Sequence, residues 1–138
     1  MRFMQEIIED TKEAVGDTMA VAVRFSSETN ATSCGGDGNP IPGETEEILG
    51  SLGELPDLWD ININDYSLEM GLSRFTSEAA LEPYVKGIKK LTSKPVVTVG
   101  RFTSPDTMVN QLKQGIIDLI GAARPSIADP FLPNKIKE

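Results

Sequence analysis

A chain of 138 residues, 39% of them apolar and 25% charged, has the length and composition of one globular domain rather than of a disordered segment. Its 13 basic and 21 acidic residues give a net charge of −8, which argues against nucleic acid as a partner because a phosphate backbone requires a basic surface. The absence of histidine excludes histidine acid–base chemistry and histidine metal ligands.

The chain has a single cysteine, Cys34, so it can form no internal disulfide and has no CxxC metal motif. This cysteine usage favours a reducing compartment, and we expect the cytoplasm. The first fifteen residues are amphipathic and acidic, and no run of 18 apolar residues occurs. The sequence therefore predicts neither a signal peptide nor a membrane partner.

Hydrophobic periodicity predicts helices that alternate with strands. In the first half we expect a helix at residues 2–15 and a strand buried on both faces at 18–25. A long loop at 26–43, a second helix at 44–54 and a second strand at 58–64 follow. Long loops are usually functional or mobile.

The second half, after a loop that reaches residue 75, is predicted to hold a helix at 77–91, a strand at 94–100, a helix at 105–114, a strand at 117–123 and a short helix after Asp129. Pro83 lies well inside the first of these helices, and a proline there kinks a helix or moves its start. Ser104 is an N-cap candidate. The alternation of strands and helices predicts an α/β fold of about four parallel strands, in a single domain over residues 1–138.

Polar residues follow the carboxyl ends of these strands, where parallel α/β folds bind ligands. Arg24, Gly100-Arg101 and Ala122-Ala123-Arg124 close the first, third and fourth strands, and Asn62 lies near the end of the second. Small residues allow close approach to the backbone, and a guanidinium matches a phosphate. The pattern favours an anionic ligand; the competing interpretation places each arginine in a structural salt bridge. No G-x-G-x-x-G or Walker loop supports a nucleoside triphosphate site.

The stretches AVAVRF, LWDIN, KPVVTVGRF and GAARPSIADP resemble the carboxyl-terminal half of the flavin barrel in the old yellow enzyme family, above all its trimethylamine and dimethylamine dehydrogenase branch. The resemblance covers nearly the whole chain. It implies that the chain is half of a TIM (β/α)8 barrel, barrel strands 5–8 with flanking helices, from an FMN-dependent oxidoreductase. The branch's catalytic tyrosine and histidine and its 4Fe-4S cysteines fall outside this chain.

The resemblance also assigns cofactor-binding residues. Arg24 matches the arginine that faces the pyrimidine edge of the flavin. Gly100 and Arg101 match the backbone that holds the FMN phosphate after the seventh strand, and Ala122, Ala123 and Arg124 match the phosphate site after the eighth. Ahead of the Ser73-Arg74-Phe75 motif, Tyr66 falls where the branch has a substrate-binding aromatic, and Glu69 where it has a catalytic aspartate.

We expect the isolated chain to be catalytically inactive, since the resemblance places only part of the flavin site within it. Half a barrel leaves two sheet edges and an apolar inner face uncovered, which predicts a homodimer or a higher oligomer. A second interpretation is an autonomous, catalytically inactive module in which four βα units form an open flavodoxin-like sheet and serve as an interaction domain. A third is a binder of small phosphates without redox chemistry.

Overall fold

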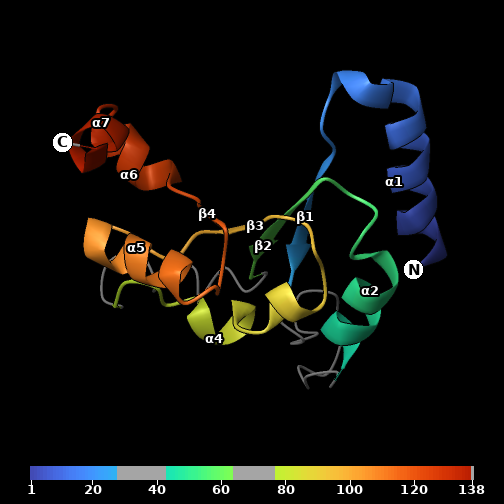
Figure 1. Ribbon diagram of the computed structural model, residues 1–138, viewed down its shortest axis with the longest axis horizontal. Coiled ribbons are helices and arrows are strands. Elements are labelled where there is room, and N and C mark those ends of the chain that lie inside the picture. Colours follow the sequence, from blue (N-terminus) through green and yellow to red (C-terminus); the bar gives the residue numbers. More distant parts are fainter. Residues whose placement is uncertain (28–42, 64–76, 138) are drawn as a thin grey trace, which may run out of the picture.

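The structure is a computed structural model that describes residues 1–27, 43–63 and 77–137. Its elements, in chain order, are α1 Arg2–Val15, η1 Gly16–Thr18, β1 Ala22–Ser26, α2 Glu44–Leu52, β2 Leu58–Asn62, α4 Glu82–Val85, η3 Ile88–Lys90, β3 Val96–Thr98, α5 Pro105–Lys113, β4 Leu119–Ile120, α6 Ala123–Ala128 and α7 Leu132–Lys137 (Figure 1).

The four strands form one parallel sheet in the order β1-β2-β3-β4, which is also their order in the chain. Consecutive parallel strands require a crossover connection between each pair, and helices occupy these connections. Figure 1 shows α2, α4 and α5 along one side of the strands, with α1 and the α6–α7 pair at opposite ends of the molecule. The predicted α/β fold with four parallel strands is confirmed.

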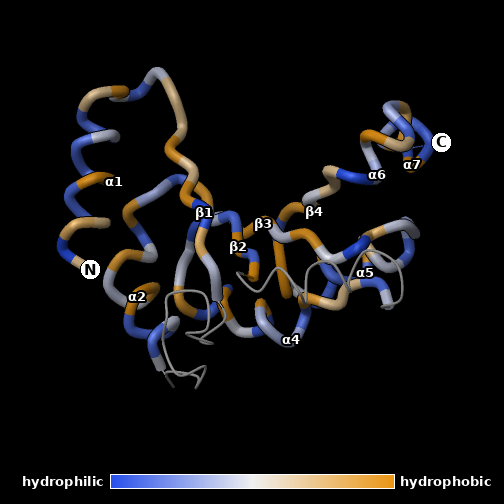
Figure 2. The backbone as a smooth tube through the Cα atoms, turned by 180° about the vertical axis from the view of Figure 1, so that it is seen from behind, coloured by the Kyte–Doolittle hydropathy of each residue, from blue (hydrophilic) through white to orange (hydrophobic). Residues whose placement is uncertain are grey.

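The core lies between the sheet and these helices. Trp59 and Ile61 of β2 and Val96 of β3 are fully buried and pack with residues of the helices, such as Leu49 of α2 and Val85 of α4. Figure 2 shows apolar stretches of backbone at the strands that form this core. Because side chains alternate along a strand, the residues between these buried ones point to the opposite face of the sheet.

That opposite face is more open. The strand register aligns Arg24 with Asp60, Asp60 with Val97, and Val97 with Leu119. Arg24 and Leu119 are exposed, while Asp60 and Val97 are half-buried. Over the described part of the chain, Figure 1 shows no helix laid across this face, which corresponds to the interior of a complete barrel.

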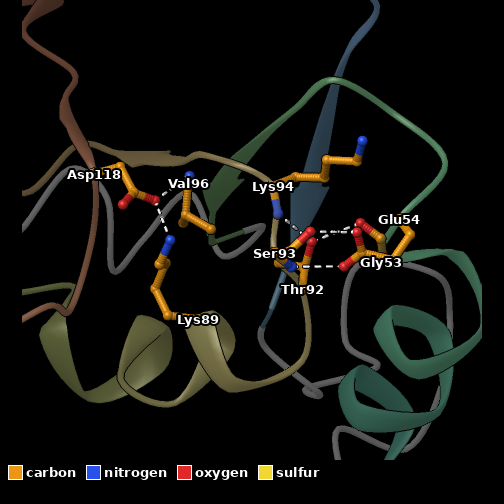
Figure 3. A network of polar contacts seen from close by, with 8 residues as sticks. All are labelled: Gly53, Glu54, Lys89, Thr92, Ser93, Lys94, Val96 and Asp118. Atoms are coloured by element: carbon orange, nitrogen blue, oxygen red, sulfur yellow. Dashed lines mark hydrogen bonds and ion pairs between the residues drawn. The ribbon is translucent and has the colours of Figure 1, made fainter.

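The amino ends of the strands are joined by carboxylates (Figure 3). Asp118, just before β4, accepts hydrogen bonds from the backbone N–H of Val96 (2.8 Å) and from Lys89 Nζ (2.6 Å). Glu54, after α2, accepts from the backbone N–H (2.6 Å) and hydroxyl (2.5 Å) of Ser93. Because each carboxylate joins segments far apart in the sequence, these contacts hold neighbouring strands together at this end.

Three predicted elements need correction. The first strand, predicted at 18–25 and buried on both faces, is the shorter β1, and its alternate residues are exposed because β1 is an edge of the sheet with one uncovered face. The helix predicted at 77–91 is replaced by α4 and η3, because Pro83 sits in the first turn of α4 and Gly87 has φ 105°. The last strand ends at Ile120, since Ala123 already begins α6.

The remaining predictions of helices and strands agree with the structure within a few residues. Ser104 caps α5, accepting from the Thr107 N–H at 3.4 Å, and Pro105 is its first residue. Asp129 Oδ1 accepts from the Phe131 N–H just before α7. Most of the long loop predicted at 26–43 and of the loop that reaches residue 75 lies outside the described residues.

Candidate functional site

A cavity of about 380 Å³ opens at the carboxyl ends of the strands. Its walls come from β1, from the end of β2, from the segment after β3, and from the segment after β4 with the start of α6. The lining residues are Arg24, Asn62, Val99, Arg101, Phe102, Thr103, Gly121, Ala122, Ala123, Arg124, Pro125 and Ala128. The structure therefore brings five of the six predicted cofactor-binding residues to one cavity.

The segment after β3 places Arg101 in the wall of the cavity. Arg101 has φ 56°, a left-handed conformation that costs an L-residue roughly 1 kcal/mol or more. Gly100, the sixth predicted residue, is buried beneath it and is not part of the lining. A Cβ at Gly100 would lie 3.3 Å from the Cα of Ala79, whose N–H donates to the Gly100 carbonyl at 2.8 Å. Gly100 thus supports the wall, while Arg101 forms it.

The segment after β4 contributes backbone and one guanidinium. Gly121 donates its N–H to the Thr98 carbonyl at 2.8 Å, which holds this segment against β3. Ala122 and Ala123 follow, and neither carries a side chain that could fill the cavity. Arg124, in the first turn of α6, is exposed. No hydrogen bond or ion pair joins the Arg124 side chain to any residue in the described stretches.

Arg24 reaches the cavity from the opposite side. It does not end its strand as predicted but lies in the middle of β1, two residues before Ser26. Its Nε–H donates a hydrogen bond to Asp60 Oδ2 at 2.8 Å, and its Nη2 lies 2.7 Å from the same oxygen in an ion pair. The salt-bridge interpretation is thus correct for Arg24, which also lines the cavity.

Charge is distributed unevenly between the two ends of the sheet. Three arginines line the cavity at the carboxyl end, although the chain is acidic overall. At the amino end, hydrogen bonds from Lys12 Nζ and then from the Val21 N–H lower the pKa of Asp57 below its ordinary value. Burial raises the pKa of Asp118, but the hydrogen bonds from Lys89 and Val96 outweigh it and lower that pKa. Among the described residues, the lining of the cavity thus holds three cationic side chains and no carboxylate.

Some predicted residues cannot be placed. Tyr66, Glu69 and Cys34 lie outside the residues that the structure describes. Within residues 1–27, 43–63 and 77–137, no group of three or more Cys, Asp or Glu side chains is arranged to hold a metal ion. In the same stretches no helix is both long enough and apolar enough to cross a membrane.

Two features of the site were missed by the sequence analysis. Phe102 and Thr103 belong to the lining, and their signal was their position directly after the Gly100-Arg101 pair. Asp60 is the partner of Arg24, and no local signal reveals it because the pairing depends on the register between two strands.

Comparison with known proteins places the chain in a family. All of it, residues 1–138, matches the NADH:flavin oxidoreductase / NADH oxidase family. The chain belongs to this family. Members of the NADH:flavin oxidoreductase family are FMN-dependent oxidoreductases, so the resemblance that the sequence suggested is confirmed at the level of the family.

Individual relatives cover almost all of the chain. Dimethylamine dehydrogenase from Hyphomicrobium sp. (strain x) is 41% identical over 140 residues, which span 99% of this chain and 19% of that protein. Among solved structures, 6-hydroxypseudooxynicotine amine oxidase from Pseudomonas geniculata N1 matches with a TM-score of 0.87 and 52% identity. The match covers 99% of this chain and 20% of the amine oxidase chain. Histamine dehydrogenase from Rhizobium sp. 4-9 matches with a TM-score of 0.87 and 49% identity, over 99% of this chain and 19% of the dehydrogenase chain.

These solved structures are TIM-barrel oxidoreductases, so the four strands are part of a β/α barrel. The chain spans about a fifth of the length of the relatives that it matches. In TIM barrels the carboxyl ends of the strands carry the active site, and the last two strands often hold a phosphate. The cavity described above lies at those ends of β3 and β4.

Proposed function

We propose that this chain holds the phosphate of FMN, in the cavity at the carboxyl ends of β3 and β4, as part of an oxidoreductase that acts on amines. The observation that carries the proposal is a single cavity lined by Arg24, Arg101 and Arg124 and by the small residues Gly121 to Ala123. The amine substrate is inferred from the relatives, because a dimethylamine dehydrogenase, a histamine dehydrogenase and an amine oxidase are all 41–52% identical to the chain.

The residues present fit a flavin mononucleotide. Its phosphate carries close to two negative charges, and guanidinium forks bind such an oxyanion well. Arg101 and Arg124 stand next to backbone that is free of bulky side chains, so the phosphate can reach main-chain N–H groups of residues 122–124. Arg24, on the far wall, is placed for the ring system. FMN itself, when bound, supplies the acceptor for the electrons removed from the substrate.

Substrate binding is assigned to residues outside the described part of the chain. We propose that Tyr66 contributes an aromatic wall to the substrate pocket and that Glu69 is the carboxylate that faces the amine. Both follow β2, whose carboxyl end borders the cavity through Asn62. A carboxylate attracts an ammonium group and can accept a proton, which suits both binding and general base catalysis.

The test is a titration of FMN against three forms of the protein, followed by quenching of flavin fluorescence. Arg124→Ala removes one charge-assisted contact, which is worth about 1.5–3 kcal/mol, and should weaken FMN binding about tenfold or more. Arg2→Ala is the matched control, since Arg2 is exposed on α1 and pairs only with Glu6 among the described residues.

Arg2→Ala should bind FMN as tightly as the unmutated chain. Equal affinities of the unmutated chain and Arg124→Ala would contradict the phosphate site. No binding by any of the three forms would favour the alternative of an inactive module without a flavin.

A further inference from the structure

The contact between Arg24 and Asp60 joins a residue that lines the cavity to the inner strand β2. The two residues are direct partners in the register of β1 and β2, and both point to the face that the helices leave open. A single carboxylate oxygen, Asp60 Oδ2, accepts a hydrogen bond from Arg24 Nε (2.8 Å) and forms an ion pair with Arg24 Nη2 (2.7 Å). Arg24 lines the cavity and Asp60 does not. Arg24 is therefore the residue of this pair that can contact a ligand in the cavity.

The geometry leaves part of the guanidinium available to a ligand. An arginine has five N–H donors; Asp60 accepts the one on Nε and lies in an ion pair with Nη2. The two N–H groups on Nη1 have no partner among the residues that the structure describes. Asp60 thus fixes the guanidinium from one edge while the other edge stays open.

Stability does not account for this pair. The Arg24 side chain is 68% exposed and that of Asp60 is 24% exposed. Exposed ion pairs contribute little to the free energy of unfolding, because water screens the charges and ordering two side chains costs entropy. Asp60 occupies a position whose aligned neighbour is the apolar Val97. A carboxylate there is better explained by its effect on Arg24.

We propose that Asp60 is a positioning residue for the flavin: it orients the Arg24 guanidinium toward the ring and offsets part of its positive charge. The inference rests on the proposed FMN site. A reduced flavin carries a negative charge that a nearby guanidinium stabilises, so an unopposed arginine favours the reduced form. Asp60 weakens that effect and keeps the flavin easier to reoxidise after two electrons have been accepted.

The experiment measures the midpoint potential and the FMN affinity of the flavin-loaded protein in four forms. Asp60→Asn removes the charge and keeps a hydrogen-bond acceptor, and Asp60→Glu keeps the charge. Asp10→Asn is the matched control, because Asp10 is exposed on α1, and Figure 1 shows α1 at the opposite end of the molecule from α6, whose start lines the cavity. The fourth form is the unmutated protein.

The expected result is that Asp60→Asn still binds FMN but has a higher potential, by about tenfold in the equilibrium constant for reduction, or about 30 mV for a two-electron couple. Asp60→Glu should restore a value near that of the unmutated protein, and Asp10→Asn should not change it. A purely structural role would alter affinity or folding and leave the potential of the bound flavin unchanged.

Two other results would overturn the inference in distinguishable ways. An unchanged potential in Asp60→Asn with FMN bound would contradict the role of Asp60 and leave the FMN site intact. Failure of the unmutated protein to bind FMN would contradict the proposed function, and the role of Asp60 with it. Should Asp60→Asn not fold, Asp60→Ser removes the same charge and is judged by the same outcomes.

Discussion

Gly121 determines how closely the last strand approaches β3 at the cavity. A Cβ at this position would lie 2.8 Å from Val99 Cγ1 and 2.9 Å from the Thr98 carbonyl oxygen. Neither contact can be relieved cheaply, because one atom is backbone and the other belongs to a stiff β-branched side chain. The missing side chain therefore lets the main chain after β4 form the wall of the cavity.

Gly121→Ala is expected to lower the free energy of unfolding by about 1–3 kcal/mol through overpacking, and to weaken FMN binding. Gly50→Ala is the matched control, because nothing lies within 4 Å of a Cβ built at Gly50 in α2, and alanine favours a helix by about 0.5–1 kcal/mol. Urea denaturation of both variants provides the measurement. A Gly121→Ala protein as stable as Gly50→Ala would show that the close approach is not required.

For single residues, the sequence predicts which side chains belong to the site better than it predicts where they lie along their strands. Arg101 and Arg124 could be recognised because each follows a predicted strand and a small residue. The same reasoning placed Arg24 at a strand end, whereas it lies within β1 and pairs with Asp60. That partnership depends on the register of two strands separated by more than thirty residues, which local patterns do not encode.

At the scale of elements, the amino ends of neighbouring strands are held by carboxylates. Asp57, just before β2, accepts from the Val21 N–H (2.8 Å) near β1 and from Lys12 Nζ (2.6 Å) on α1. Asp118 connects β4 in the same manner to β3 and to Lys89. The repeated arrangement suits the end of a barrel that serves stability rather than catalysis.

These contacts predict a loss of stability in acid. The pKa values of Asp57 and Asp118 are lowered in the folded chain, so the unfolded chain binds protons more readily. Their contribution is present above the unfolded pKa of about 4 and is lost as the pH falls through the lower folded values. Urea denaturation between pH 6 and pH 3 should show a smaller loss for Asp57→Asn and Asp118→Asn than for the unmutated chain. Parallel curves for all three proteins would contradict this explanation.

The sequence predicts a helix boundary where the signal is local and misses it where the signal is absent or conflicts with hydrophobic periodicity. The helix after Ser104 could be predicted because a cap and a first-turn proline act locally. The segment 77–91 was misjudged, because its apolar periodicity suggested one helix while Pro83 and Gly87 divide it. The start of α6 was missed because the run from Leu119 to Ala123 is uniformly small or apolar, and because Ala122 stands at the N-cap position, where it makes no side-chain cap hydrogen bond.

At the scale of the whole molecule, the sheet has one covered and one open face. Within the described chain β1 and β4 are its edges, and Figure 1 shows α2, α4 and α5 along one side of it. Leu119 of β4, Phe3 of α1, and Ile127 and Phe131 of the α6–α7 region are exposed apolar side chains. Unpaired edges and exposed apolar surface favour association with another chain.

We therefore expect a preparation of this 138-residue chain to be a homodimer or a higher oligomer. A twofold arrangement that pairs edges or covers the open faces should bury more than about 2,000 Å², as obligate dimers do. Light scattering at micromolar concentration gives the mass directly. A stable monomer would show that the edges and the open face do not drive association, and would favour the autonomous module.

The central claim is that the carboxyl ends of β3 and β4 hold the FMN phosphate. Backbone amide NMR spectra recorded during a titration with FMN test this claim most directly, because each amide reports on its own position. We expect saturable shifts at residues 100–103 and 121–124, and unchanged signals for Glu54, Ser93 and Asp118 at the amino ends of the strands. Shifts confined to those amino ends, or no saturable shifts at residues 100–103 and 121–124, would contradict the claim.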